Sequence, residues 1–144
     1  MTLIDTNVLL YAADSLAPQH PAVSKWLADL FAGPETVGMP WTSIWGFLRI
    51  GTTARLWTQT RSLAELFGFV RDWLSEPGVA LIQPGPRHAE LLERLVTQYG
   101  ASGPLLSDAV LAATALEHGA TLASTDRDFS RFAELKWVNP LDAA

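Results

Sequence analysis

Three aspartates lie where a carboxylate could take part in chemistry: Asp5, Asp108 and Asp126. Asp5 directly follows the apolar run of residues 2–4, and Asp108 directly precedes an alanine-rich run. Asp126 follows a second apolar run, near the end of the stretch SDAVLAATALEHGATLASTDRDF at 107–129. A carboxylate at the end of a buried segment can bind a divalent cation or accept a proton. Shared chemistry requires the fold to bring both ends of the chain together.

The hydrophobic pattern predicts strands and helices that alternate along the chain. We expect strands at 2–5, 36–40, 79–82, 121–125 and 136–138. We expect helices at 6–14, 20–32, 42–56, 62–76, 86–100 and 108–118, followed by a helical turn at 126–133. Small polar residues at the helix starts predict N-caps at Thr6 or Asn7, at Thr42 or Ser43, and at Ser107.

This alternation predicts a single α/β domain over residues 1–144, with a mostly parallel sheet covered on both faces. Ligand sites in open parallel sheets lie beyond the carboxyl ends of the strands. Asp5 and Asp126 each end a predicted strand, and Asp108 opens the helix that leads into the second of these strands. We therefore expect the three carboxylates to meet at one edge of the sheet.

Each aspartate also has an ordinary structural explanation, as a helix cap or as a charge that complements a helix dipole. Together they are harder to explain this way, because two unit charges ~4 Å apart repel by ~4 kcal/mol at an effective dielectric constant of about 20. A bound cation would offset that repulsion. Carboxylate ligands without histidine or cysteine favour Mg²⁺ or Mn²⁺.

The composition excludes several classes of site. The chain has no cysteine, which rules out disulfides, thiolate zinc sites and cysteine nucleophiles. Its three histidines lack the spacing of a metal motif, and its net charge of -5 argues against nucleic-acid binding through a broad basic face. No run approaches the ~20 apolar residues of a membrane span, and no basic lead-in precedes the apolar start, so we expect a cytoplasmic protein.

The two end motifs, LIDTNVLLYA and SDAVLAATALEHGATLASTDRDF, resemble the signatures of PIN-domain proteins, and more closely those of VapC-type toxins of bacterial toxin–antitoxin pairs. The resemblance implies a PIN-like α/β/α sandwich and an Mg²⁺-dependent endoribonuclease that hydrolyses RNA with a metal-activated water. Mn²⁺ is expected to substitute for Mg²⁺. It also implies a VapB-type antitoxin as partner, and a homodimer. Matched to the family residue by residue, Asp5 is the first acidic ligand, Asp108 the third acidic position and Asp126 the fourth, with Asp128 in a supporting place. From the three acids at the strand ends we expect Asp5 and Asp108 to bind the metal directly, and Asp126 to bind it through water or to position the attacking water.

The chain departs from the family pattern at one position. PIN-domain proteins usually carry a glutamate on the helix that reads TSIWGFLRIGT here, and aligning Arg49 with the family's arginine places Gly46 at that position. No acidic residue occurs from Thr36 to Ala64. Gly46 implies either a metal held by fewer carboxylates and more water, or a weakened site. The alternative function is accordingly a PIN-like binding module with reduced catalysis.

Two further features leave alternatives open. Trp41, Trp45 and Trp57 flank a segment with three arginines at 49, 55 and 61, and could stack on bases, bind an antitoxin helix or simply pack in a core. Other phosphate-handling α/β folds fit less well. A receiver domain would need paired acids after the first strand, and a haloacid-dehalogenase-type phosphatase would need an aspartate where Asn7 stands.

Overall fold

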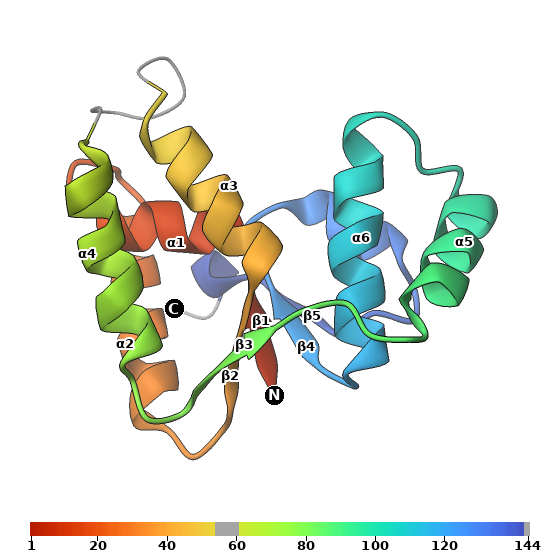
Figure 1. The fold of residues 1–144 in the computed structure, drawn as a ribbon, viewed down its shortest axis with the longest axis horizontal. Coiled ribbons are helices and arrows are strands. Elements are labelled where there is room, and N and C mark those ends of the chain that lie inside the picture. Colours follow the sequence, from red (N-terminus) through yellow and green to blue (C-terminus); the bar gives the residue numbers. More distant parts are fainter. Residues whose placement is uncertain (54–60, 143–144) are drawn as a thin grey trace.

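A five-stranded parallel sheet forms the centre of the protein, in a computed structural model that describes residues 1–53 and 61–142 (Figure 1). The strand order is β3-β2-β1-β4-β5, and all neighbouring pairs are parallel. The strands are β1 (Thr2–Ile4), β2 (Val37–Pro40), β3 (Val79–Ile82), β4 (Thr121–Ala123) and β5 (Trp137–Val138). The predicted sheet is therefore confirmed, and β1 lies at its middle.

Burial explains why β1 occupies this central place. Leu3 and Ile4 are fully buried and point to opposite faces of the sheet, as successive strand residues do. Leu3 pairs with Gly38 on one side and with Leu122 on the other. A Cβ atom at Gly38 would overlap the Leu3 side chain, so a larger residue there would force Leu3 to shift.

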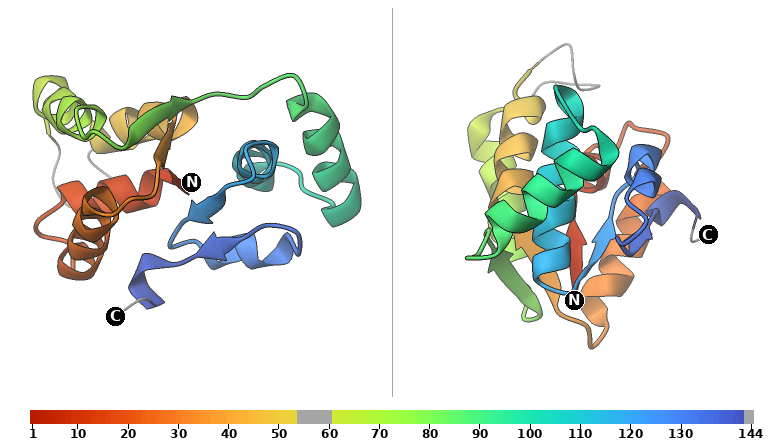
Figure 2. Two further views of the ribbon diagram at one scale, coloured as in Figure 1. Left: turned by 90° about the horizontal axis from the view of Figure 1, so that it is seen from below. Right: turned by 90° about the vertical axis from the view of Figure 1, so that its right-hand side faces the viewer.

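Helices cover both faces of the sheet, as the sequence predicts. They are α1 (Thr6–Ala13), α2 (His20–Ala32), α3 (Trp41–Gly51), α4 (Leu63–Leu74), α5 (His88–Tyr99) and α6 (Pro104–Glu117). Two short 3-10 helices follow, η1 (Arg127–Arg131) and η2 (Pro140–Asp142). Figures 1 and 2 show α1 to α4 on one side of the sheet and α5 and α6 on the other. None of the described helices combines the length and apolar character needed to cross a membrane.

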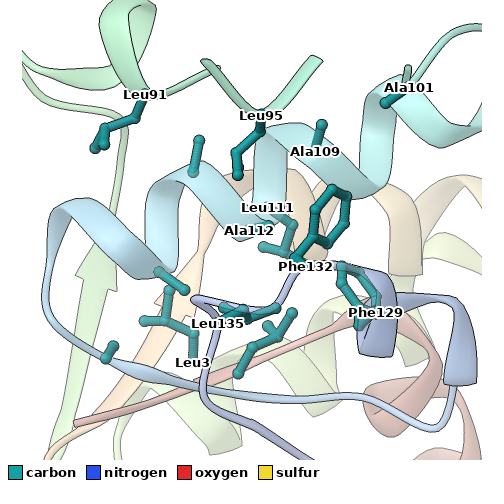
Figure 3. Packing of buried hydrophobic residues seen from close by; sticks show 14 of the residues in the cluster. Leu3, Leu91, Leu95, Ala101, Ala109, Leu111, Ala112, Phe129, Phe132 and Leu135 are labelled. Atoms are coloured by element: carbon teal, nitrogen blue, oxygen red, sulfur yellow. The ribbon is translucent and has the colours of Figure 1, made fainter. Parts of the chain in front are cut away.

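Each face of the sheet has its own hydrophobic core. On one face Leu3 and Leu122 pack with residues of α5, α6 and η1, including Leu95 and Phe129, and with Phe132 directly after η1. Figure 3 shows Leu3, Leu95, Phe129 and Phe132 in this cluster. On the other face Ile4 and other strand residues pack with α1 to α4. The resulting layers, helices on sheet on helices, are the expected α/β/α sandwich.

The structure corrects three predicted boundaries. Asp5, and neither Thr6 nor Asn7, is the N-cap of α1. Helix α3 begins at Trp41, directly after the strand residue Pro40. Helix α6 begins at Pro104 because proline has the backbone angle of a first helical residue and needs no partner for a missing N–H.

As a result, neither Thr42, Ser43 nor Ser107 is an N-cap. The predictions for Arg55 and Trp57 fall outside the described residues.

Candidate active site

The carboxyl ends of β1 and β4 place Asp5 beside the chain that leads to Asp126. Ile4 pairs with Ala123, and the Asp5 amide donates a hydrogen bond to the Ala123 carbonyl at 3.0 Å. The Asp5 carboxylate accepts the first free amide of α1, from Thr6, at 2.7 Å. Asp5 is therefore both a helix cap and a residue at the sheet edge, and its structural role does not exclude a chemical one.

Ser124 and Asn7 hold the second oxygen of the Asp5 carboxylate. The Ser124 hydroxyl donates to Asp5 Oδ2 at 2.7 Å and accepts the Asp126 amide at 3.0 Å. The Asn7 side-chain amide donates to Asp5 Oδ2 at 3.2 Å and to Ser124 Oγ at 3.0 Å, while its oxygen accepts the Thr125 amide at 3.1 Å. Because Ser124 is fully buried, this network fixes the two strand ends relative to each other.

Three further carboxylates gather next to this network. Asp108, Asp126 and Asp128 each offer an oxygen, and these atoms all lie within 4.8 Å of one another. Asp126 caps η1 by accepting the Asp128 amide at 2.9 Å, and Asp128 also lies 3.7 Å from the Arg131 guanidinium. Asp108 is the fifth residue of α6, one turn further into the helix than its predicted position.

The electrostatics show that the four aspartates share one environment. Burial, and then the neighbouring charges of Asp126, Asp5 and Asp128, raise the pKa of Asp108 from its ordinary 3.8 to about 6. Burial also raises the pKa of Asp5, and the charge of Asp126 adds to the effect despite the opposing hydrogen bond from Ser124. Without a cation, Asp5 and Asp108 therefore resist ionisation.

A pocket of about 310 Å³ opens beside Asp5 and Asp108. Helices α3 and α6 supply most of its wall, and they come from opposite faces of the sheet (Figure 1). The residues from α3 are Thr42, Ser43, Gly46, Arg49 and Ile50. Asp5 and Asp108 thus share the pocket with residues of α3 that carry two hydroxyl groups and one guanidinium group.

Comparison with known proteins identifies the family to which this arrangement belongs. Residues 2–135 match the PIN domain. Ribonuclease VapC33 of Mycobacterium tuberculosis is 40% identical over 141 residues, which is 98% of this chain and 99% of the relative. The chain belongs to the VapC ribonucleases of the PIN-domain family. The resemblance of the two end motifs is thereby confirmed over nearly the whole chain.

Several solved structures share the fold of this chain. A VapBC2 complex from Rickettsia felis, bound to a DNA fragment from its promoter, aligns with a TM-score of 0.68 at 18% identity, covering 96% of this chain and 97% of the other. A toxin–antitoxin complex from Klebsiella pneumoniae aligns with a TM-score of 0.61 at 20% identity, covering 97% and 98% of the two chains. At these identities the likeness concerns the fold alone.

The missing family glutamate has a packing explanation in this VapC chain. A Cβ atom at Gly46 would lie 2.6 Å from Thr6 Oγ1 and 3.2 Å from Thr6 Cγ2. The Thr6 hydroxyl in turn donates to the Ser43 carbonyl at 3.1 Å and so joins α1 to α3. Thr6 therefore occupies the space into which a side chain at position 46 would extend.

The acidic residues fit a hard divalent cation. All their donor atoms are carboxylate oxygens, which Mg²⁺ and Mn²⁺ prefer. Two of the histidines contact backbone carbonyls instead. His20 Nδ1 lies 2.8 Å from the Tyr11 carbonyl oxygen, and His118 Nε2 lies 3.1 Å from the Gln83 carbonyl oxygen. Within residues 1–53 and 61–142, the group able to hold a metal contains aspartates only.

Sequence reasoning placed Asp5, Asp108 and Asp126 together at one edge of the sheet. It did not predict the hydrogen bond from Ser124 to Asp5 or the contact of Thr6 with Gly46. Both depend on residues 37 or more positions apart. The one sequence signal for Ser124 was its position two residues before Asp126. A capping role would explain that position equally well.

Proposed function

We propose that this VapC-family chain is an Mg²⁺-dependent endoribonuclease and the toxin of a type II toxin–antitoxin pair, with Mn²⁺ able to substitute. The observation that carries the proposal is the convergence of Asp108, Asp126 and Asp128 within 4.8 Å beside the pocket that Asp5 lines. The 40% identical relative is named as a ribonuclease, and this supports RNA as the substrate of the chain.

In the proposed mechanism Asp5 and Asp108 hold the ion, and Asp126 positions the attacking water. A bound Mg²⁺ would supply charge compensation for the phosphate and activation of water. Ser124 and Asn7 keep the Asp5 carboxylate oriented toward the pocket by occupying Oδ2. Water adds to phosphorus and the bond to the 3′ oxygen breaks, which leaves a 5′-phosphate and a 3′-hydroxyl.

Asp128 has two roles open to it within this proposal. It lies in the same group as Asp108 and Asp126, so its carboxylate is close enough to share an ion with them. Its proximity to Arg131 also allows a supporting role, in which it keeps that guanidinium beside the other acids. Comparing Asp128→Asn with Asp108→Asn separates the two, because a direct ligand should weaken Mg²⁺ binding as strongly as Asp108 does.

The proposal extends to partners. We propose a VapB-type antitoxin that covers the site, a homodimeric toxin and a cytoplasmic location. The structural likeness to a VapBC2 complex and to a toxin–antitoxin complex supports the antitoxin.

The test is cleavage of total cellular RNA with mapped 5′ ends, in Mg²⁺, in Mn²⁺ and in EDTA. Wild type is compared with Asp5→Asn, Asp108→Asn and Asp126→Asn, and with Asp72→Asn on the exposed surface of α4 as a matched control. We expect discrete cuts that require metal and disappear in the three site variants only. RNA that stays intact with wild type, yet is still bound by it, would favour the binding module that Gly46 allows.

A further inference from the structure

The outer surface of α3 carries an aromatic and basic stripe next to the acidic pocket. Trp41, Trp45 and Arg49 follow one another at intervals of four residues, so they lie along the same side of the helix. The rings of Trp41 and Trp45 stack with centroids 6.2 Å apart and planes 27° apart. Trp41 packs partly against the core, whereas Trp45 is 61% exposed.

These two tryptophans line a second, largely apolar pocket of about 490 Å³. Trp41, Thr42 and Trp45 form one side of it, and Gln83 and Pro84 form the other. Thr42 also borders the acidic pocket, so the two pockets are neighbours. A ligand that is bound for cleavage at the carboxylates can therefore extend directly onto the tryptophans.

Arg49 stands where a polyanion would need it. It borders the acidic pocket and forms no ion pair with residues 1–53 or 61–142, and the seven residues between those ranges include no Asp or Glu. Arg61, by contrast, is engaged with Glu65 and lies over the Phe69 ring. A chain of net charge -5 repels a phosphate backbone, so a cation that borders the acidic pocket and forms no ion pair within the described residues is useful for holding one.

We propose that the stripe Trp41–Trp45–Arg49 is the substrate-positioning surface, on which an unpaired base stacks on Trp45 while Arg49 binds a phosphate next to the bond that is cut. The occupant is single-stranded RNA, because stacking on an exposed indole needs a base that is not already paired. The inference rests on the proposed function and deepens it. It makes Trp45 and Arg49 positioning residues and leaves the chemistry to the aspartates.

The experiment measures RNA affinity in an Asp108→Asn background, where the substrate stays intact, and steady-state cleavage in the otherwise wild-type protein. The variants are Trp45→Leu, Trp45→Phe and Arg49→Ala. Phe67→Leu, at a 43% exposed aromatic residue on α4, and Arg71→Ala, on the same helix, are matched controls. Sedimentation of each variant reports the oligomeric state.

We expect Trp45→Leu to weaken RNA binding about tenfold, within the range for loss of one stacked base, and Trp45→Phe to recover most of that loss. Arg49→Ala should reduce the slope of log affinity against log salt by about 0.7, the value for one phosphate of a single strand. In cleavage both changes should raise KM and leave kcat near wild type, because they remove binding that is equal in ground and transition states.

Equal RNA affinity of Trp45→Leu and Trp45→Phe, or an unchanged salt slope for Arg49→Ala, would overturn the inference. A Trp45→Leu protein that changes its oligomeric state but binds RNA normally would also overturn it and assign the surface to contact between copies. These failures are distinct from failure of the proposed function. If wild type cleaves RNA in an Asp108-dependent way while the stripe variants behave normally, the nuclease stands and only the positioning surface is wrong.

Discussion

Replacing Asp108 by asparagine should stabilise the metal-free protein at neutral pH. Burial and three neighbouring carboxylates raise the pKa of Asp108 to about 6, which means that the folded state disfavours the charged form. Asparagine has nearly the same shape and carries no charge. Burial and neighbouring charges set the pKa of Asp108, and no hydrogen bond from the described residues contributes to it. The substitution therefore removes repulsion without breaking such a bond.

The size of the effect follows from linkage between protonation and folding. A change of one pKa unit corresponds to about 1.4 kcal/mol, so a rise from 3.8 to about 6 sets an upper limit of ~3 kcal/mol on the cost of ionising Asp108 in the folded state. Asp108 is only half-buried, and water screens its charge, so we expect about 1 kcal/mol. For a chain of this length that corresponds to a rise in Tm of roughly 3 °C.

The sign of the pH dependence is fixed by the raised pKa. The folded state binds the Asp108 proton more tightly than the unfolded state does, so the related stability is fully present below about pH 4 and is lost as the pH rises through about 6. The Asn variant keeps that stability at all pH values. The gain over wild type should therefore be large at pH 7.5 and near zero at pH 4.

The assay is thermal or urea unfolding in EDTA at both pH values, with Asp72→Asn as a control at an exposed aspartate. The reasoning would be refuted if Asp108→Asn were less stable than wild type at pH 7.5. It would be refuted equally by a gain of the same size at both pH values, since the effect would then come from packing or helix propensity and not from charge.

Three further predictions follow from the same site. Mg²⁺ should raise the Tm of wild type at pH 7.5 but have little effect at pH 4 or on Asp108→Asn, because protonated or amide groups bind it poorly; calorimetric titration checks this. Gly46→Ala alone should be neutral or destabilising, because the new methyl group would clash with Thr6. In a Thr6→Ala protein the same change should stabilise the fold by about 1 kcal/mol, which is the helix preference of alanine over glycine. Additive effects of the two changes in a double-mutant cycle would contradict the predicted clash. Ser124→Ala should cost about 1–3 kcal/mol in urea unfolding and reduce RNA cleavage, because it leaves Asp5 Oδ2 and the Asp126 amide short of a buried partner; stability within 0.3 kcal/mol of wild type, roughly the error of such comparisons, would count against the network.

The sequence alone determined the layers of the fold and the edge of the sheet at which the site lies. Strand and helix periods are local properties, so they predicted β3 at 79–82 and α2 at 20–32 with the bounds that the structure has. The absence of cysteine, and histidines without metal spacing, limited the metal ligands to carboxylates. The alternation of elements then implied a parallel sheet, which puts the carboxyl ends of β1 and β4 at the same edge of the sheet.

Only the tertiary structure decided how the side chains at that edge meet. Ser124 reaches Asp5 across 119 positions of sequence because β1 and β4 pair in one particular register. Thr6 fills the space above Gly46 because α1 and α3 cross there, and Trp45 is exposed because of the way α3 is turned against its core. Such contacts depend on register and on the angles between elements, which arise from the packing of the whole chain and leave no local pattern in the sequence.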